Sequence, residues 1–270
     1  MFLCSQAEES EGLNKAEDRL SNRFVPVLVP LWRELLVALD WVALHASPVY
    51  HGSGIPHGDG APVVLIPGFL GNDAYLTEMH RWLRRIGYCP YLSNIGQNAE
   101  CPDILAQRLF RTINRAFRET GRKVQLVGHS LGGIIARSAA GHRPSQVAQV
   151  ITMGSPVNEI RAHPTVLAMA GFVRGRVQWR HRSRVDPQCY TGECNCEFVQ
   201  SLRRGLPPAI PLTSIYTKTD GIVDWRSCLY GDEKANIEVK GTHGGLAFNA
   251  QVFREIAFLL SPNGRLSGDE

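Results

Sequence analysis

The sequence lacks several features that mark specialised classes of protein. Its first residues carry neither the positive charge nor the long apolar run of a secretory signal, which predicts a cytoplasmic protein. The chain has no internal repeats. The balance of 29 Lys and Arg against 25 Asp and Glu leaves a net charge of only +4, and no nucleic-acid-binding module is recognisable. These absences argue against a nucleic-acid-binding protein.

A transmembrane span is also lacking. The apolar stretch over 31–46 is too short to cross a bilayer comfortably, and Arg33, Glu34 and Asp40 interrupt it. Pro30 suits the first turn of a helix that begins there. We interpret the stretch as a helix packed on the domain or on a partner subunit. The alternative is an anchor on a membrane surface, which would make the protein peripherally membrane-associated.

The cysteines do not form a metal-binding pattern. There are seven, and the cluster of Cys189, Cys194 and Cys196 lacks both the usual zinc spacing and a histidine close behind it. In an oxidising compartment, a disulfide could join this cluster to Cys228. The missing signal argues against such a compartment, so the pairing stays open.

Length and composition predict one large domain. With 270 residues, 44% of them hydrophobic and 20% charged, the chain can bury a single core. The polar, acidic segment 1–22 is predicted to be flexible, and 23–270 to form the domain. Apolar runs alternate with amphipathic stretches, which predicts an α/β fold with a mostly parallel central sheet and helices on both faces. The expected strands are 61–67, 88–93, the apolar first part of 124–136, 147–153, 212–217 and 237–240, and the expected helices are 75–86, 104–119, 134–140 and 246–260.

One segment, 157–211, does not follow this alternation. It is long, proline-containing and arginine-rich, and only 164–173 has the composition of a helix. Because it lies between two strands, it should project over the carboxyl ends of the sheet, where open α/β sheets bind ligands. We therefore predict an inserted cap or lid.

The most informative motif is the run over 124–136. An apolar strand leads into a tight glycine turn with one serine, and a helix follows, which is the pattern of a nucleophile elbow. Gly128 and Gly132 allow the strand and the helix to approach closely, and the sharp turn exposes the hydroxyl of Ser130. Ser130 is the candidate nucleophile.

A serine hydroxyl needs a general base to remove its proton during attack. Of the nine histidines, His243 is the one in a glycine-rich loop after the final strand, from which it can reach the elbow. His129 is adjacent to Ser130 in the sequence but should point elsewhere. His243 is therefore the predicted base.

The base in turn needs a carboxylate that fixes its tautomer and stabilises the imidazolium. Asp220 follows the strand 212–217 and precedes a glycine, whereas Asp224 lies four residues further on. We favour Asp220 as the acid because it comes first after the strand, and keep Asp224 as the alternative.

Attack on a carbonyl also creates an oxyanion, which backbone N–H groups can stabilise. The residue after the nucleophile, Leu131, supplies one candidate donor. The glycine-containing loop after the first core strand supplies a second, Phe69.

Four motifs together resemble the α/β-hydrolase superfamily, in its bacterial lipase and esterase-like branch. They are Pro-Gly-Phe-Leu-Gly (67–71), Gly-His-Ser-Leu-Gly-Gly (128–133), Thr-Asp-Gly-Ile-Val-Asp-Trp (219–225) and Gly-Thr-His-Gly-Gly-Leu (241–246). The resemblance spans about 61–260. It implies Ser130, Asp220 and His243 as a triad, Phe69 and Leu131 as oxyanion-hole donors, and neither a metal nor an organic cofactor. Pro67 departs from the histidine that many relatives have before the first glycine.

The resemblance implies a carboxylic ester hydrolase with an acyl-enzyme on Ser130, acting on a small-molecule or lipid ester. Leu70, Leu167 and Phe172 are candidate contacts for an apolar acyl group. The alternative is an acyltransferase with the same triad, in which an alcohol or amine replaces water. A non-catalytic binding protein with this fold is a further alternative. Oligomeric state, acyl-chain length and alcohol portion stay open.

Overall fold

A computed structural model describes residues 25–181, 185–186, 188–189 and 193–261, so the segment predicted to be flexible, 1–22, lies outside the described residues. The centre of the fold is a six-stranded sheet in the order β3-β2-β4-β5-β7-β8, and every neighbouring pair is parallel. The predicted mostly parallel sheet is thus confirmed. The strands are β2 (Pro62–Ile66), β3 (Cys89–Leu92), β4 (Val124–His129), β5 (Val147–Met153), β7 (Leu212–Tyr216) and β8 (Asn236–Glu238).

The central strands are apolar on both faces, which requires a cover on both sides. In β2, Val64 and Ile66 belong to one hydrophobic cluster, and Val63 and Leu65 belong to another on the opposite face. All five residues of β2 are buried. The alternation of side chains along a strand divides the core into two layers.

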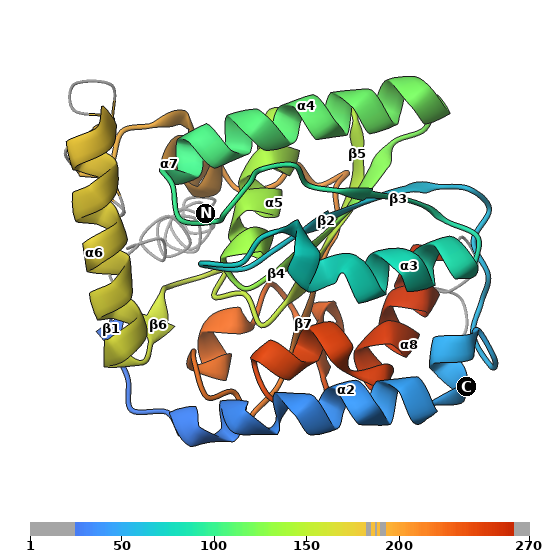
Figure 1. Ribbon diagram of the computed structural model, residues 1–270. Coiled ribbons are helices and arrows are strands. Elements are labelled where there is room, and N and C mark those ends of the chain that lie inside the picture. The colour runs from blue at the N-terminus through green and yellow to red at the C-terminus, as the bar shows by residue number, and fades with distance from the viewer. Residues whose placement is uncertain (1–24, 182–184, 187, 190–192, 262–270) are drawn as a thin grey trace, which may run out of the picture.

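Helices cover both faces of the sheet, as predicted (Figure 1). One layer contains α4 (Pro102–Thr120), α5 (Leu131–His142) and α7 (Glu197–Arg204). The other layer contains α2 (Val37–Ala46), α3 (Thr77–Arg85) and α8 (Ala250–Leu260).

The predicted helix over 246–260 is two helices in the structure. The short 3-10 helix η7 (Gly244–Phe248) ends at Asn249, whose side chain accepts hydrogen bonds from the N–H groups of Gln251 and Val252. Such a side-chain cap starts a new helix and breaks the chain direction before it. The remaining 3-10 helices are η1 (Leu31–Leu36), η2 (Pro48–His51), η3 (Asp73–Leu76), η5 (Trp225–Cys228) and η6 (Glu233–Ala235).

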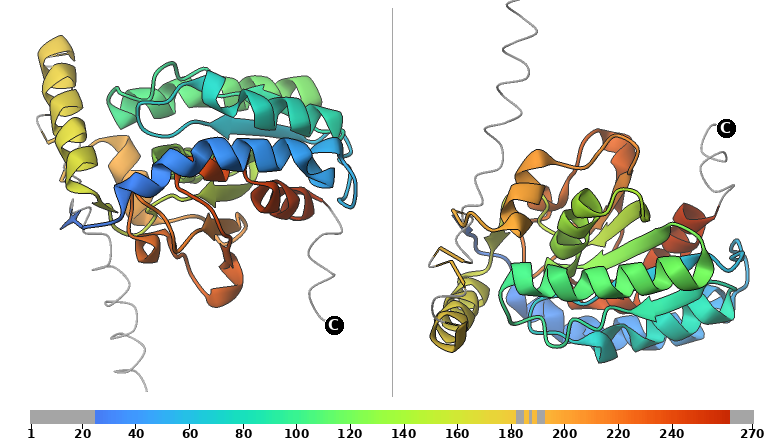
Figure 2. Two further views of the ribbon diagram at one scale, coloured as in Figure 1. Left: turned by 60° about the horizontal axis from the view of Figure 1, so that its bottom comes forward. Right: turned by 90° about the horizontal axis from the view of Figure 1, so that it is seen from above.

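The segment 157–211 has two different parts. Its helix α6 (Pro164–His181) is longer than the predicted 164–173 and stands at the margin of the molecule in both views of Figure 2. It follows the short strand β6 (Arg161–Ala162), which pairs in parallel with β1 (Val25–Pro26). In contrast, α7 packs against α5 and α4 inside the core. Only part of this segment therefore stands apart from the sheet.

The apolar stretch 31–46 forms η1 followed by α2, which runs along one side of the molecule (Figure 1). Leu44 is its fully buried residue and packs in the core layer of α8. On the outer side, Leu35 and Trp32 are 83% and 65% exposed. Among the helices that the structure describes, none combines the length and hydropathy needed to span a membrane. The stretch thus packs on the domain while keeping an apolar outer surface.

The start of α5 approaches β2 closely enough to require glycine. A Cβ atom on Gly132 would lie 2.3 Å from the carbonyl oxygen of Ile66 and 2.5 Å from that of Pro67. Both neighbours are backbone atoms, which cannot rotate away as a side chain can. This close approach sets the position of the turn between β4 and α5.

The substitution Gly132→Ala should destabilise the protein by about 2–3 kcal/mol, because the added methyl group forces backbone atoms apart. The measurement is the free energy of unfolding in urea. Gly175→Ala is the matched control, because Gly175 lies in α6 with no atom within 4 Å of the added Cβ. That variant should be neutral or slightly more stable, since alanine favours helix. Equal effects of the two substitutions would contradict the packing argument.

Candidate active site

Ser130 occupies a strained turn between β4 and α5. Its φ and ψ are 52° and −126°, a conformation that non-glycine residues rarely adopt. The turn is held because the N–H of Ser130 donates to the carbonyl of Met153 at 2.8 Å, and the N–H of Gly133 donates to the carbonyl of Ser130 at 3.0 Å. Such strain at a serine between strand and helix is the geometry of a nucleophile elbow.

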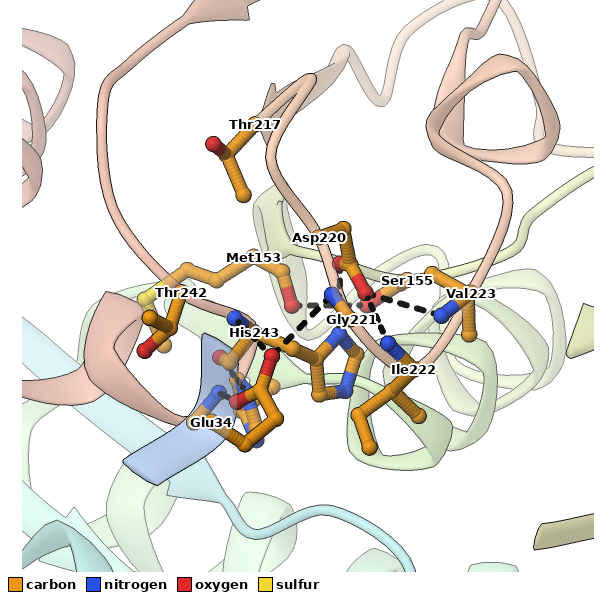
Figure 3. A network of polar contacts seen from close by, with 12 residues as sticks. Glu34, Met153, Ser155, Thr217, Asp220, Gly221, Ile222, Val223, Thr242 and His243 are labelled. Atoms are coloured by element: carbon orange, nitrogen blue, oxygen red, sulfur yellow. Dashed lines mark hydrogen bonds and ion pairs between the residues drawn. The ribbon is translucent and has the colours of Figure 1, made fainter. Parts of the chain in front are cut away.

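Asp220 and His243 lie in loops that follow β7 and β8, and they meet in a buried hydrogen bond. The distance from His243 Nδ1 to Asp220 Oδ2 is 2.6 Å (Figure 3). The other oxygen of Asp220 accepts hydrogen bonds from the N–H groups of Ile222 and Val223, both at 2.8 Å. The carboxylate is therefore fixed on both sides, and it fixes the ring of His243.

Asp224, the alternative acid, has different partners. Its Oδ1 accepts the N–H of Arg226 at the start of η5, and its Oδ2 lies 3.2 Å from Nε of Arg161. Among the described residues it makes no hydrogen bond to His243. Asp224 caps a helix and pairs with arginine, whereas Asp220 contacts the imidazole.

Ser130 and His243 line the same cavity of about 590 Å³. Within the described part of the chain, no hydrogen bond joins the hydroxyl of Ser130 to the ring of His243. The two groups nevertheless face one space, and catalytic hydrogen bonds are often long until a substrate is bound.

The pKa of His243 is set by opposing influences. Burial lowers it, but the charge and hydrogen bond of Asp220, together with the charge of Glu34, raise it above the ordinary value of 6.5. The protonated imidazolium is thus stabilised inside an otherwise apolar site. This is what a general base needs when it takes a proton from a hydroxyl.

The two candidate oxyanion donors also line the cavity. Among the described residues, no hydrogen bond uses the backbone N–H of Phe69 or of Leu131, so both can donate to a ligand. Asn98, which the sequence analysis did not single out, holds the loop of Phe69. Its backbone oxygen accepts the N–H of Leu70 at 2.8 Å, and its side-chain amide donates to the carbonyl of Pro67 at 2.8 Å.

His129 is buried beside these groups, and among the described residues its ring makes no hydrogen bond to Ser130. Its Nε2 lies 2.9 Å from the carbonyl oxygen of His243, and it is the donor because a carbonyl only accepts. Burial, followed by the charge of His243, lowers the pKa of His129 to about 3. His129 is therefore neutral and supports the backbone of the loop that carries His243.

The cavity walls are mainly apolar. Of the three predicted acyl contacts, Leu70 and Leu167 line the cavity. Phe172 does not, and this prediction needs correction: its side chain is 76% exposed on α6. A helix at the margin presents only one face to the cavity, and Phe172 lies on another. Further apolar lining residues are Leu31, Val37, Ile134, Ile160, Val166 and Met169.

Glu34 is a residue of the site that the sequence analysis noted only as a charge in an apolar stretch. Its carboxylate accepts hydrogen bonds from the backbone N–H groups of Gly221 and His243 (Figure 3). It also accepts one from the N–H of Gly244. Nothing in the local sequence indicates this role, because its partners follow about 190 to 210 residues later.

The cysteine pairing left open by the sequence is now constrained. All six cysteines of the described residues are free thiols, and Cys228 packs with Ala162 and Val223. Cys189 instead contacts Cys101, with 3.2 Å between the two sulfur atoms. The described residues include no group of His, Cys, Asp or Glu arranged to hold a metal ion.

Comparisons with known proteins give matches to parts of the chain. Residues 103–180 match the model of the PGAP1-like alpha/beta domain family. A triacylglycerol lipase of Burkholderia plantarii is 32% identical over 124 residues, which are 43% of this chain and 35% of that protein. The chain spans about a third of the length of the curated relatives it matches.

Solved structures with the same fold are more distant in sequence. A soluble variant of the monoglyceride lipase of Saccharomyces cerevisiae has a TM-score of 0.53 at 14% identity, over 77% of this chain and 89% of that one. A Bacillus licheniformis lipase has a TM-score of 0.52 at 17% identity, over 77% and 95% of the two chains. At this identity the likeness establishes the fold.

The substitution Asp220→Asn should lower the pKa of His243. It removes the carboxylate that raises this pKa, so burial dominates and the value falls below 6.5. NMR titration of the imidazole measures this directly. Asp224→Asn is the matched control and should leave the pKa of His243 within a few tenths of the wild-type value, because its partners are Arg161 and Arg226. The reverse ranking would identify Asp224 as the acid.

Proposed function

We infer that this chain, a member of the α/β-hydrolase superfamily with lipase and esterase-like relatives, hydrolyses carboxylic esters through an acyl-enzyme on Ser130. One observation carries the proposal. His243, which the buried Asp220 holds, lines one mainly apolar cavity together with the strained Ser130 and two backbone donors that have no partner among the described residues. Each is a part that serine-based acyl transfer requires.

The geometry supports the following sequence of steps. The hydroxyl oxygen of Ser130 attacks the ester carbonyl while Nε2 of His243 takes the proton. The N–H groups of Phe69 and Leu131 stabilise the negative charge that develops on the carbonyl oxygen. Collapse of the intermediate expels the alcohol, which receives the proton from His243. In the second half of the reaction, a water molecule attacks the acyl-enzyme in the same way, with His243 as the base, and the acid is released.

Substrate preference follows from the cavity. Its walls are mainly apolar, and about 590 Å³ is enough for an acyl chain of moderate length. Leu70 and Leu167 supply part of the wall, one from the loop after β2 and the other from α6. We therefore propose an ester with an apolar acyl group, in keeping with the triacylglycerol and monoglyceride lipases among the similar proteins.

The outer surface of 31–46 supports contact with a lipid surface as part of this proposal. Leu35, Leu39 and Trp32 expose apolar side chains to solvent, whereas Leu31, Glu34 and Val37 of the same segment line the cavity. An amphipathic segment with an outward apolar face can insert into a lipid interface. The cavity wall formed by this segment would then lie beside the source of substrate.

A chain-length series of chromogenic esters tests the proposed function. Wild type should hydrolyse esters of apolar acids, faster on emulsified than on dissolved long-chain substrate, and a fluorophosphonate should label it. Ser130→Ala should lose both properties, with a fall in kcat of about 10³-fold or more, while its melting temperature stays close to that of wild type. The matched control, Ser145→Ala, changes an exposed serine after α5 and should retain full activity.

The acceptor of the acyl group, water or an added alcohol, distinguishes a hydrolase from an acyltransferase. Added alcohol should capture only a minor part of the acyl group, because water performs deacylation. Nearly complete transfer to the alcohol would contradict hydrolysis as the main reaction. Retained labelling in Ser130→Ala would contradict the choice of nucleophile.

A further inference from the structure

Glu34 joins the two loops that carry Asp220 and His243. Its Oε1 accepts the N–H of Gly221 and the N–H of His243, each at 3.0 Å, and its Oε2 accepts the N–H of Gly244 at 2.8 Å. Hydrogen bonds to an ionised carboxylate are charge-assisted and therefore stronger than those between neutral groups. A residue of η1 thereby connects the loop after β7 to the loop after β8.

The backbone of His243 is held from two sides. Its N–H donates to Glu34, and its carbonyl oxygen accepts from Nε2 of His129 at 2.9 Å. The next carbonyl, that of Gly244, accepts the hydroxyl of Tyr75. The peptide groups around His243 therefore have partners in η1, β4 and η3, and the direction of the ring depends on them.

The close contact between Glu34 and the aspartate loop depends on glycine. A Cβ atom on Gly221 would lie 2.8 Å from Oε1 of Glu34 and 2.9 Å from the carbonyl oxygen of Pro30. The segment 30–34 thus rests directly on the peptide that follows Asp220. Any larger residue at 221 would push the two apart.

We propose that Glu34 is a positioning residue for the triad, which holds the Asp220 and His243 loops in register so that the imidazole faces Ser130. This inference rests on the proposed function. Glu34 does not touch the reacting atoms through a hydrogen bond of its own; it acts through the backbone of Gly221, His243 and Gly244. Its charge also contributes to the raised pKa of His243.

The substitution Glu34→Gln tests this role. The amide keeps the shape but loses the charge and places a donor against backbone N–H groups. We expect kcat on a short-chain ester to fall roughly 10- to 100-fold, with KM within about twofold of wild type, because misplacement affects the reaction more than binding. The melting temperature is recorded for every variant. Glu233→Gln, on the exposed helix η6, is the matched control and should retain wild-type kcat.

A second readout separates positioning from a general loss of structure. The titratable or charged groups that face His243 are Asp220, Glu34 and His129. Removing the charge of Glu34 should lower the pKa of His243, so the acid limb of kcat/KM should move to lower pH. Glu34→Asp keeps the charge but is too short to reach both loops. It should retain the pKa of His243 while kcat stays below wild type.

The outcomes are distinct. If Glu34→Gln keeps kcat within twofold of wild type and leaves the pKa of His243 unchanged, the inference is overturned. If Glu34→Gln does not fold, Glu34→Asp decides: a lowered kcat with a retained melting temperature supports the inference, and unchanged kcat refutes it. If wild type hydrolyses no ester, the proposed function fails, and NMR titration of His243 in the same variants still tests the contact with Glu34.

A second inference rests on an independent observation, the pair Cys101 and Cys189. Both thiols are buried, and their sulfur atoms lie 3.2 Å apart in a small cluster with Ala99 and Val173. A hydrogen bond from Cys189, partly opposed by burial and aided by backbone N–H groups at the start of α4, lowers the pKa of the Cys101 thiol to about 7. Cys101 is therefore the more reactive thiol of the pair.

We propose that Cys101 and Cys189 form a disulfide when a low-molecular-weight disulfide is present. The thiolate of Cys101 attacks one sulfur of that disulfide and releases one thiol, which leaves a mixed disulfide on Cys101. The thiol of Cys189 then loses its proton and displaces the second thiol, so the two protein sulfurs are oxidised and the reagent is reduced to two thiols. The bond would tie the chain after α6 to the start of α4.

Oxidised glutathione, followed by acid quench and peptide mapping without reductant, tests the pairing. A Cys101–Cys189 peptide should appear, and tris(carboxyethyl)phosphine should remove it and lower the melting temperature by several degrees. Cys101→Ser and Cys189→Ser should each abolish that peptide, and Cys89→Ser, outside the pair, should retain it. A pairing of Cys189 with Cys194, Cys196 or Cys228, or no linked peptide at all, would refute the proposal.

Discussion

The buried hydrogen bond between Asp220 and His243 is the interaction on which the rest of the site depends. It places a charged carboxylate inside an apolar surrounding, where an unpaired charge would be very costly. Hydrogen bonds offset that cost: one oxygen accepts from the N–H groups of Ile222 and Val223, and the other contacts the imidazole. The same contact orients the ring and favours its protonated form. The packing around this pair and its electrostatics therefore favour the same arrangement of carboxylate and imidazole.

The loops that carry this pair have little regular structure of their own, so they take their positions from neighbouring elements. The N-terminal segment that contains Glu34 lies across them, while its neighbours Leu31 and Val37 contribute to the cavity wall. A single segment therefore supports the acid and base loops, shapes the cavity and exposes apolar side chains on its outer side. A change in the position of 31–46 on the domain would move Glu34 and thereby the two loops to which it is hydrogen-bonded.

The sheet and the elbow were predictable because their signals are local. The apolar runs of β2, β4 and β5 and the glycines around Ser130 are readable within a few residues, and most element bounds agree with prediction to within two residues. The break at Asn249 and the outward direction of Phe172 were not predicted. Each depends on capping or on helix orientation, for which apolar composition alone carries no signal.

What the sequence by itself determined is the order of elements and the identity of the groups suited to acyl transfer: a serine on a strand-to-helix turn, and an aspartate and a histidine after later strands. Only the tertiary structure decided between Asp220 and Asp224 as partner of His243, brought Glu34 and Asn98 to the site, and placed the free thiols of Cys101 and Cys189 in contact. The physical reason is the separation along the chain over which each kind of interaction acts. Strand and turn preferences act between neighbours in the chain, whereas these contacts join residues that only the folded sheet brings within hydrogen-bond distance.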